Sequence, residues 1–240
     1  MIWAVRSVIC LPTYNEHENL ERMLRALGDK GVRVLVIDDN SPDGTGELAD
    51  RLAQELDYVD VLHRESKEGL GPAYLAGFRH ALASDADLVL EMDCDFSHDP
   101  NYVPHLIAAV EGGADLALGS RYVPGGGVRN WGLVRRLISA GGSSYARIIL
   151  GVKIRDLTGG FKCYRRAVLE AIDLDAVESK GYAFQIETTY RALRAGFKVV
   201  EVPITFADRE VGGSKMSKAI VAEAIWKVPG LRLKALLGRI

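Results

Sequence analysis

Short apolar runs alternate, along the first half of the chain, with segments in which apolar residues recur every three or four positions. The runs are rich in Val, Ile and Leu, and they predict β-strands because these residues favour an extended backbone. The predicted strands occupy 7–12, 32–38, 59–63, 87–93 and 115–120. The second run is apolar almost without interruption, which is typical of a strand that is buried on both faces.

The segments between these strands have the periodicity of helices with one apolar face. In the first segment, Leu20, Leu24 and Leu27 fall on the same side of the predicted helix. Further helices are expected at about 45–56, 71–83 and 101–111. Repeated strand–helix units predict an α/β fold with a Rossmann-like, mostly parallel sheet, flanking helices and right-handed crossovers.

The second half of the chain has a less regular pattern. A glycine-rich loop at 123–130 comes first, and a turn is expected at 156–160. The predicted elements are helices at 133–150 and 184–195 and a strand at 198–206. A helical tail from 217 onward is expected to break at Pro229 and Gly230, because proline lacks the amide hydrogen that a helix interior requires. We expect the whole chain to form a single domain.

The composition narrows the class of protein. The chain has 240 residues, of which 48% are hydrophobic and 26% are charged, with a formal net charge of −2. This balance is typical of a soluble globular protein and does not suggest nucleic acid as a partner. Three dispersed cysteines indicate buried thiols in a reducing compartment. With no signal-peptide pattern and no run of about 18 apolar residues, we expect a cytoplasmic protein that does not span a membrane.

The small net charge conceals an uneven distribution of charged residues. Residues 1–120 contain 9 Lys or Arg and 22 Asp or Glu, a balance of −13, whereas residues 121–240 contain 21 and 10, a balance of +11. An acidic segment suits the binding of a cation, and a basic segment suits phosphate groups or an anionic membrane. We therefore expect the two halves to contribute different parts of one site.

Polar residues follow four of the predicted strands. Ligands of open parallel sheets bind beyond the carboxyl ends of the strands. Carboxylates gathered there repel each other, and a hard divalent cation with a phosphate-bearing ligand removes that cost. The residues at these strand ends are Pro12, Tyr14 and Glu16; Asp38, Asp39 and Asp43; Asp93, Asp95, Ser97, His98 and Asp99; and Arg121.

Asp93 and Asp95 are the candidate metal ligands. Alternate residues of an extended segment point the same way, so both carboxylates can approach one cation. The alternative is a solvated turn that also caps the next helix. Asp38 and Asp39 have a similar alternative, because the SPDG segment that follows is rich in turn-forming residues.

Two common nucleotide-binding motifs are missing from the chain. No GxxxxGK[ST] string is present, and the segment GLGPAY does not complete the pattern GxGxxG. We therefore do not expect a P-loop kinase or an NAD-dependent enzyme.

Seven segments resemble the family 2 glycosyltransferases with the GT-A fold, and more narrowly the polyprenol-phosphate (dolichol-phosphate) mannose synthases. In chain order they are PTYNE, VIDDNSPDGT, LEMDCDFSHDP, GSRY, DLTGGFKCYRR, GYAFQIE and EVPITFADREVGGSKMS. The resemblance implies the fold of nucleotide-diphospho-sugar transferases over one domain, 1–240. It divides this domain into a nucleotide and metal half (1–120), an acceptor half (121–215) and a C-terminal amphipathic helical tail (216–240).

The resemblance also implies roles for individual residues. The nucleotide-binding residues would be Pro12, Tyr14, Glu16, Asp39, Asp93, Arg209 and Lys215. The ligands of Mg²⁺ or Mn²⁺ would be Asp93, Asp95 and Ser97, where Ser97 replaces a Gln of some relatives. The acceptor phosphate would contact Arg121, Arg135 and Ser139, and Asp156 would orient the sugar or a basic neighbour. The residues with a catalytic role would be Asp95, Arg121 and Arg209.

The reaction implied by the resemblance is a metal-dependent, inverting transfer of mannose from GDP-mannose to a polyprenyl phosphate. Its product, a polyprenyl-phosphate mannose, would serve as a donor for glycan or glycolipid synthesis. One alternative is the transfer of glucose or another sugar to the same lipid, because no single residue selects mannose. Another is a non-catalytic subunit that binds nucleotide sugars.

The tail supports two interpretations. Residues 214–240 contain six Lys or Arg and one Glu, interleaved with apolar residues. An amphipathic helix on anionic lipid would make the protein peripheral to the cytoplasmic face of a membrane. Alternatively, the apolar face of the helix packs onto the domain. Because relatives have transmembrane helices or depend on a membrane subunit, a separate membrane-anchoring protein is a further expected partner.

Overall fold

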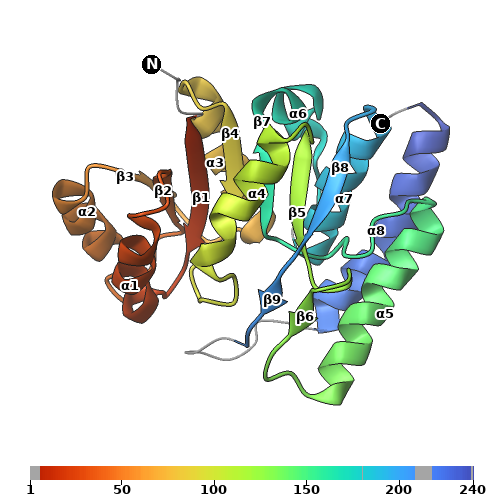
Figure 1. The fold of residues 1–240 in the computed structure, drawn as a ribbon, viewed down its shortest axis with the longest axis horizontal. Coiled ribbons are helices and arrows are strands. Elements are labelled where there is room, and N and C mark those ends of the chain that lie inside the picture. The colour runs from red at the N-terminus through yellow and green to blue at the C-terminus, as the bar shows by residue number, and fades with distance from the viewer. Residues whose placement is uncertain (1–5, 180, 209–217, 239) are drawn as a thin grey trace.

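A seven-stranded β-sheet lies at the centre of the structure, and helices cover both of its faces (Figure 1). The computed structural model describes residues 6–179, 181–208, 218–238 and 240. The strands of the sheet are, in spatial order, β3 (Val59–His63), β2 (Arg33–Asp38), β1 (Ser7–Thr13), β4 (Leu88–Glu91), β7 (Lys162–Arg165), β5 (Leu116–Ser120) and β8 (Val199–Pro203). The longer helices are α1 (His17–Leu27), α2 (Thr45–Glu55), α3 (Leu70–Ala83), α4 (Val103–Glu111), α5 (Leu133–Leu150), α7 (Tyr182–Arg194) and α8 (Lys218–Leu236).

The smaller elements lie mostly in the second half of the chain. They are the parallel pair β6 (Gly127–Val128) and β9 (Thr205–Phe206), the short helix α6 (Arg166–Ala171), and the 3₁₀ turns Pro100–Tyr102 and Leu174–Ala176. The predicted strand at 198–206 is therefore two strands, β8 in the main sheet and β9 in the small one. Ile204, between them, is buried in the core.

Strand β2 separates two hydrophobic cores. Val34 and Val36 pack into the core formed with α1, α2 and α4, whereas Leu35 and Ile37 pack into the core formed with α3 and α7. Adjacent residues of a strand point to opposite faces, so both cores draw on one short segment. The expectation of a strand buried on both faces is confirmed.

Every strand of the main sheet except β7 runs in the same direction. The carboxyl ends of β1, β2, β4 and β5 therefore lie at one edge of the sheet, as the sequence predicts. Strand β4 ends at Glu91, earlier than the predicted 87–93, so Asp93 lies in the following loop. This loop has more freedom to place carboxylates than a strand would allow.

Strand β7 was not predicted, and it is antiparallel to both of its neighbours. Its register places Lys162 opposite Glu91 of β4, and both side chains are fully buried. The Nζ of Lys162 donates to the carbonyl of Gln185 (2.9 Å), and the Tyr164 hydroxyl donates to Glu91 Oε1 (2.8 Å). Burial lowers the pKa of Lys162 to about 8 and raises the pKa of Glu91. A strand that begins with lysine has no local signal of burial, because its partners lie far away in the sequence.

Helices α5 and α8 lie side by side at the end of the sheet formed by β5 and β8 (Figure 1). Ala146 and Leu150 of α5 and Val228 and Leu231 of α8 are buried together against Tyr190 of α7. In the described part of the tail, the helix thus packs one face onto the domain, as the second interpretation of the tail expected.

The tail helix is continuous through Pro229, so the predicted break at Pro229 and Gly230 is wrong. Proline at this position cannot donate to the carbonyl of Ile225, four residues earlier. The Tyr145 hydroxyl of α5 donates to that carbonyl instead, at 2.9 Å. A neighbouring helix therefore supplies the hydrogen bond that the proline removes, and this contact cannot be read from the tail alone.

The outward faces of α5 and α8 are also apolar. On α5, the exposed apolar residues recur at the spacing that places them on one side of a helix. They are Leu133, Val134, Leu137, Ile138 and Ile148 on α5, and Ile225, Trp226, Leu233, Leu236 and Leu237 at the end of the chain. Among its described side chains, from 225 onward, α8 therefore carries apolar residues both on its packed face and on its exposed face. Within the described residues, no helix is long and apolar enough to cross a membrane.

The Glu91–Lys162 pair predicts a test of stability. Lys162→Met should lower the free energy of unfolding by about 3–5 kcal/mol, because it leaves the buried Glu91 without its opposite charge. Urea denaturation followed by circular dichroism measures the change. The matched control is Arg33→Met, which removes the exposed pair with Asp60 and should cost less than about 1 kcal/mol. Equal losses in the two variants would contradict the structural role of the buried pair.

Candidate active site at the carboxyl edge of the sheet

The loops after β1 and β2 form the first part of the site. Asp38 is buried and organises the turn: it accepts from the Ser41 hydroxyl (2.5 Å), the Ser41 amide (3.1 Å) and the Thr13 hydroxyl (3.3 Å). Asp39 is buried as well and pairs with Arg64, whose Nη1 lies 2.5 Å from Asp39 Oδ1. Burial raises the pKa of Asp39 although Arg64 opposes the shift. The two aspartates therefore have different contacts: Asp38 accepts hydrogen bonds within the turn, and Asp39 forms an ion pair with the guanidinium group of Arg64.

The remaining residues predicted to bind the nucleotide come from β1 and the loop that follows it. Pro12 is a member of the strand and pairs in register with Ile37. The ring of Tyr14 lies 3.8 Å from the ammonium group of Lys67. Glu16 precedes α1 and accepts from the Asn19 side chain at 2.9 Å. These residues lie at the same edge of the sheet as Asp39.

The loop after β4 holds the candidate metal ligands. The Ser97 amide and hydroxyl both donate to Asp95 Oδ1, at 3.0 and 2.5 Å, so Ser97 orients this carboxylate. The Asp93 amide donates to His98 Nδ1 at 3.0 Å, so a neutral His98 carries its proton on Nε2. The Tyr74 hydroxyl donates to Asp93 Oδ1 at 3.1 Å. Burial and the nearby Asp93 carboxylate raise the pKa of Tyr74, which keeps this donor protonated.

The chemistry of this loop fits a hard divalent cation. Asp95 and Ser97 are buried, whereas the Asp93 side chain is 28% exposed, and the available donors are oxygen atoms. Within the described ranges, no group of three or more His, Cys, Asp or Glu side chains is placed to hold a metal by itself. Two carboxylates leave coordination positions for phosphate oxygens and water, which is how Mg²⁺ is usually held beside a diphosphate.

A buried ion pair forms the third part of the site. Arg121, directly after β5, donates to Asp156 through its amide (2.9 Å), its Nε (2.7 Å) and its Nη2 (2.6 Å). Nη2 also donates to Thr158 at 2.9 Å. Asp156 has no exposed surface and the Arg121 residue is only 8% exposed. The basic neighbour of Asp156 in the structure is therefore Arg121.

The other residues predicted to bind the acceptor phosphate lie on α5, beside this pair. The guanidinium carbon of Arg135 lies 4.2 Å from the centre of the Trp131 ring, and Nη1 of Arg135 pairs with Asp208 at 2.5 Å. The hydroxyl of Tyr122, the residue after Arg121, donates to Ser139 at 2.8 Å. Arg121, Arg135 and Ser139 are therefore brought together from β5 and α5. Arg209 and Lys215 lie outside the described residues.

Stacked rings connect the loop after β4 to the residues around Arg121. His98 stacks on Phe161 at 4.9 Å and meets Phe206 edge to face at 5.3 Å. Phe206 in turn meets Trp131 at 5.4 Å, and the Arg121 guanidinium carbon lies 5.4 Å from the Phe206 ring. Through these rings, the loop with the candidate metal ligands packs against the residues around Arg121.

Sequence reasoning missed several residues of this site. Arg64, Tyr74 and Trp131 contact predicted site residues, but none of them lies within a recognisable motif of this chain. His98 was noted only as one of several polar residues after the fourth strand. An aromatic or basic residue in a helix or loop has many structural uses, so the single sequence carries no signal that separates Arg64, Tyr74 and Trp131 from the others.

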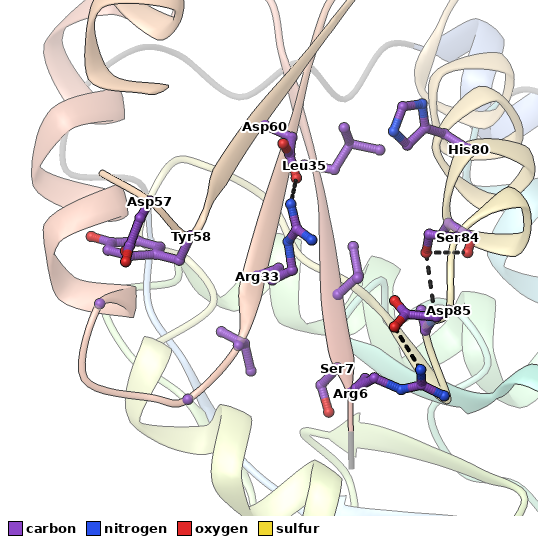
Figure 2. A pocket seen from close by; sticks show the side chains of 16 residues that line it. Arg6, Ser7, Arg33, Leu35, Asp57, Tyr58, Asp60, His80, Ser84 and Asp85 are labelled. Atoms are coloured by element: carbon purple, nitrogen blue, oxygen red, sulfur yellow. Dashed lines mark hydrogen bonds and ion pairs between the residues drawn. The ribbon is translucent and has the colours of Figure 1, made fainter. Parts of the chain in front are cut away.

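A cavity of about 620 Å³ lies at the opposite edge of the sheet, beside the first residues of β1, β2 and β3 (Figure 2). Two exposed ion pairs lie at its wall, Arg6 with Asp85 (2.5 Å) and Arg33 with Asp60 (2.6 Å). None of the predicted site residues lines it. The candidate active site is therefore distinct from this cavity.

Comparison with known proteins identifies the family of this site. The family model for "Glycosyl transferase family 2" matches residues 8–173, which include every strand end described above. The chain belongs to glycosyl transferase family 2. It is therefore a glycosyltransferase, and the resemblance seen in the sequence is confirmed.

Two relatives with high sequence identity to this chain have names that state an activity. It is 52% identical over 237 residues to the polyprenol monophosphomannose synthase of Mycolicibacterium smegmatis, covering 98% of this chain and 89% of the relative. It is also 52% identical over 226 residues to the undecaprenyl-phosphate mannosyltransferase of Micrococcus luteus, covering 93% of each.

Solved structures with the same fold share little sequence with this chain. Glucosyl-3-phosphoglycerate synthase of Mycobacterium tuberculosis, in complex with Mn²⁺, UDP and glucosyl-3-phosphoglycerate, matches 98% of this chain and 80% of its own, with a TM-score of 0.68 and 19% identity. A mannosyltransferase of Pyrobaculum calidifontis, in complex with GDP-mannose and Mn²⁺, matches 99% of this chain and 75% of its own, with a TM-score of 0.57 and 15% identity. These similarities confirm the expected GT-A fold.

The Arg121–Asp156 pair predicts a second test of stability. Asp156→Asn should lower the free energy of unfolding by about 3–5 kcal/mol, because Arg121 then stays buried without an opposite charge. Thermal and urea denaturation measure the loss. Asp60→Asn is the matched control, because the same chemical change weakens an exposed pair, and it should cost less than about 1 kcal/mol. A loss of that small size in Asp156→Asn would show that the buried pair is not structural.

Proposed function

We propose that the protein transfers mannose from GDP-mannose to a polyprenyl phosphate and forms polyprenyl-phosphate mannose. The observation that carries this proposal is the 52% identity, over nearly the whole chain, to two enzymes named for mannosyl transfer to polyprenyl phosphates. The site geometry supports it, because acidic loops and paired arginines lie at the same edge of the sheet.

On the donor side, Pro12, Tyr14, Glu16 and Asp39 would hold the guanosine, with Asp39 accepting hydrogen bonds from the base or ribose. Asp93 and Asp95 would hold Mg²⁺ or Mn²⁺ against the diphosphate, with Ser97 orienting Asp95 or contributing its own oxygen. When bound, the cation would neutralise charge on the leaving diphosphate. The mannosyltransferase of P. calidifontis, which shares the fold, binds GDP-mannose and Mn²⁺.

On the acceptor side, the nucleophile would be an oxygen of the lipid phosphate. A phosphate monoester has a second pKa of about 6, so it is largely ionised at neutral pH and requires no general base. Arg121, Arg135 and Ser139 would position it for attack on the anomeric carbon, and Arg209 and Lys215 would close over the donor phosphates. A single displacement breaks the bond to GDP as the new bond forms, so the α-linked donor gives a β-linked product.

This proposal predicts a mannolipid when the protein is incubated with GDP-mannose, a polyprenyl phosphate and Mg²⁺ or Mn²⁺. EDTA should abolish the product, and a divalent cation should restore it. Asp95→Asn should lower kcat at least 100-fold, whereas Asp99→Asn, in the same loop, should retain activity because asparagine also caps the 3₁₀ turn that follows. Product from UDP-glucose but not from GDP-mannose would overturn the donor assignment.

The lipid acceptor gives a reason for the apolar outer faces of α5 and α8. The first turns of α5 expose Leu133, Val134 and Leu137 close to Arg135 of the acceptor site, and Leu133 is 72% exposed. Arg136 is exposed on the same turns. Exposed apolar residues bordered by cations suit the interface of an anionic membrane. We infer that these two helices rest on a membrane, which makes the protein peripheral to its cytoplasmic face.

The membrane proposal predicts binding to vesicles that contain anionic lipid. The double variant Leu133→Glu/Leu137→Glu should lower the vesicle affinity at least tenfold, because burial of one leucine contributes about 1.5–3 kcal/mol. Leu70→Glu, at an exposed leucine on α3, is the matched control and should bind as the original chain does. Co-sedimentation measures all three proteins. If the original chain did not bind lipid vesicles, a separate anchoring protein would replace the membrane as the direct partner.

A further inference from the structure

Trp131 lies between the two arginines of the proposed acceptor site. It follows β6 and precedes α5, and it is only 7% exposed. The guanidinium carbon of Arg135 lies 4.2 Å from the ring centre, and that of Arg121 lies 5.6 Å from it. Phe206 meets the ring edge to face at 5.4 Å. The indole is therefore held in one orientation by neighbours on several sides.

The indole N–H of Trp131 is buried and has no hydrogen-bond partner among the described residues. Buried tryptophans usually find an acceptor for this group, because an unsatisfied buried donor costs about 1–3 kcal/mol. Within the described part of the chain, this unpaired donor lies beside two arginines, unlike the unpaired hydroxyl of Tyr190, which lies in the core between α7, α5 and α8. A ligand that brings an acceptor to this place would remove the cost.

The charged residues next to Trp131 indicate which kind of ligand would fit there. The two ring distances place the guanidinium carbons of Arg121 and Arg135 within about 10 Å of each other. Arg121 is held by the fully buried Asp156, so it keeps its position. Arg135 is paired with the partly exposed Asp208, and a pair of this kind contributes little. A phosphate group can take the place of Asp208 at Arg135 and offer further oxygens to other donors.

We propose that Trp131 is a further residue of the acceptor-phosphate site, where its indole N–H donates to a phosphate oxygen and its ring sets the spacing of the two arginines. This inference rests on the proposed function, because it takes the phosphate to be that of the lipid acceptor. Trp131 binds and positions the phosphate. No covalent bond forms or breaks at its ring, and no proton is transferred there. Its hydrogen bond is therefore expected to act on acceptor binding and not on the binding of the nucleotide sugar.

The test compares Trp131→Phe with a matched variant elsewhere. Tyr190→Phe also removes a buried polar hydrogen without a partner among the described residues, but from the core between α7, α5 and α8. Farnesyl phosphate is the probe, and isothermal titration without any sugar donor measures its Kd. Trp131→Phe should raise this Kd about tenfold, and Tyr190→Phe should leave it unchanged. In turnover, Trp131→Phe should raise the acceptor KM while the GDP-mannose KM stays the same.

A second measurement uses the original chain and does not depend on the folding of Trp131→Phe. The chain has three tryptophans, so a ¹⁵N-labelled sample gives three indole signals, which Trp3→Phe and Trp226→Phe assign by elimination. Farnesyl phosphate should move the Trp131 indole proton downfield, and farnesol, which lacks the phosphate, should not. An unmoved signal with bound farnesyl phosphate, or an unchanged Kd in Trp131→Phe, would overturn the inference.

The outcomes also separate this inference from the proposed function. If GDP-mannose gave no mannolipid but farnesyl phosphate still moved the Trp131 signal, the proposed transfer reaction would be contradicted. The proposed phosphate site at Trp131 would still be supported. If inorganic phosphate moved the signal as much as farnesyl phosphate at equal concentration, the site would hold a phosphate without a lipid chain, and the assignment to the lipid acceptor would be wrong.

Discussion

The buried ion pair between Arg121 and Asp156 is the interaction on which the arrangement of the site depends. Three hydrogen bonds of 2.6–2.9 Å join the end of β5 to the loop before β7, and neither charge can be left alone in the interior. The loop is tied down further, because the Asp156 amide donates to Glu201 of β8. The pair thereby holds Arg121 at the edge of the sheet, next to Trp131, Arg135 and the loop after β4.

The near-zero net charge of the chain is the sum of two unlike halves that meet at one edge of the sheet. The acidic half supplies the loops after β1, β2 and β4, and the basic half supplies Arg121 and Arg135. Such a division suits the proposed reaction between two phosphate-bearing substrates, because one would be held through a cation and the other directly by guanidinium groups. The small total is therefore uninformative about partners, whereas its distribution along the chain is informative.

The helices α5 and α8 are apolar on the face that packs and on the face that does not. Ala146, Leu150, Val228 and Leu231 bury one side, while the first turns of α5 and the last turns of α8 expose the other. A helix that served only to complete the domain would carry polar residues outward. The two-sided pattern supports the proposal that this layer lies between the catalytic domain and lipid, with the acceptor site at its border.

Sequence patterns alone were sufficient to predict the alternation of strands and helices, the α/β class and most of the residues at the strand ends. These follow from local periodicity and from the rule that parallel strands end at one edge. The antiparallel strand β7, the continuity of α8 through Pro229, and the position of Trp131 against Phe206 and two arginines are visible only in the folded chain. In each case the contact joins residues that are distant in the sequence: Glu91 with Lys162, Tyr145 with the carbonyl of Ile225, and Phe206 with Trp131. These contacts form only when the chain folds, so no local sequence pattern predicts them.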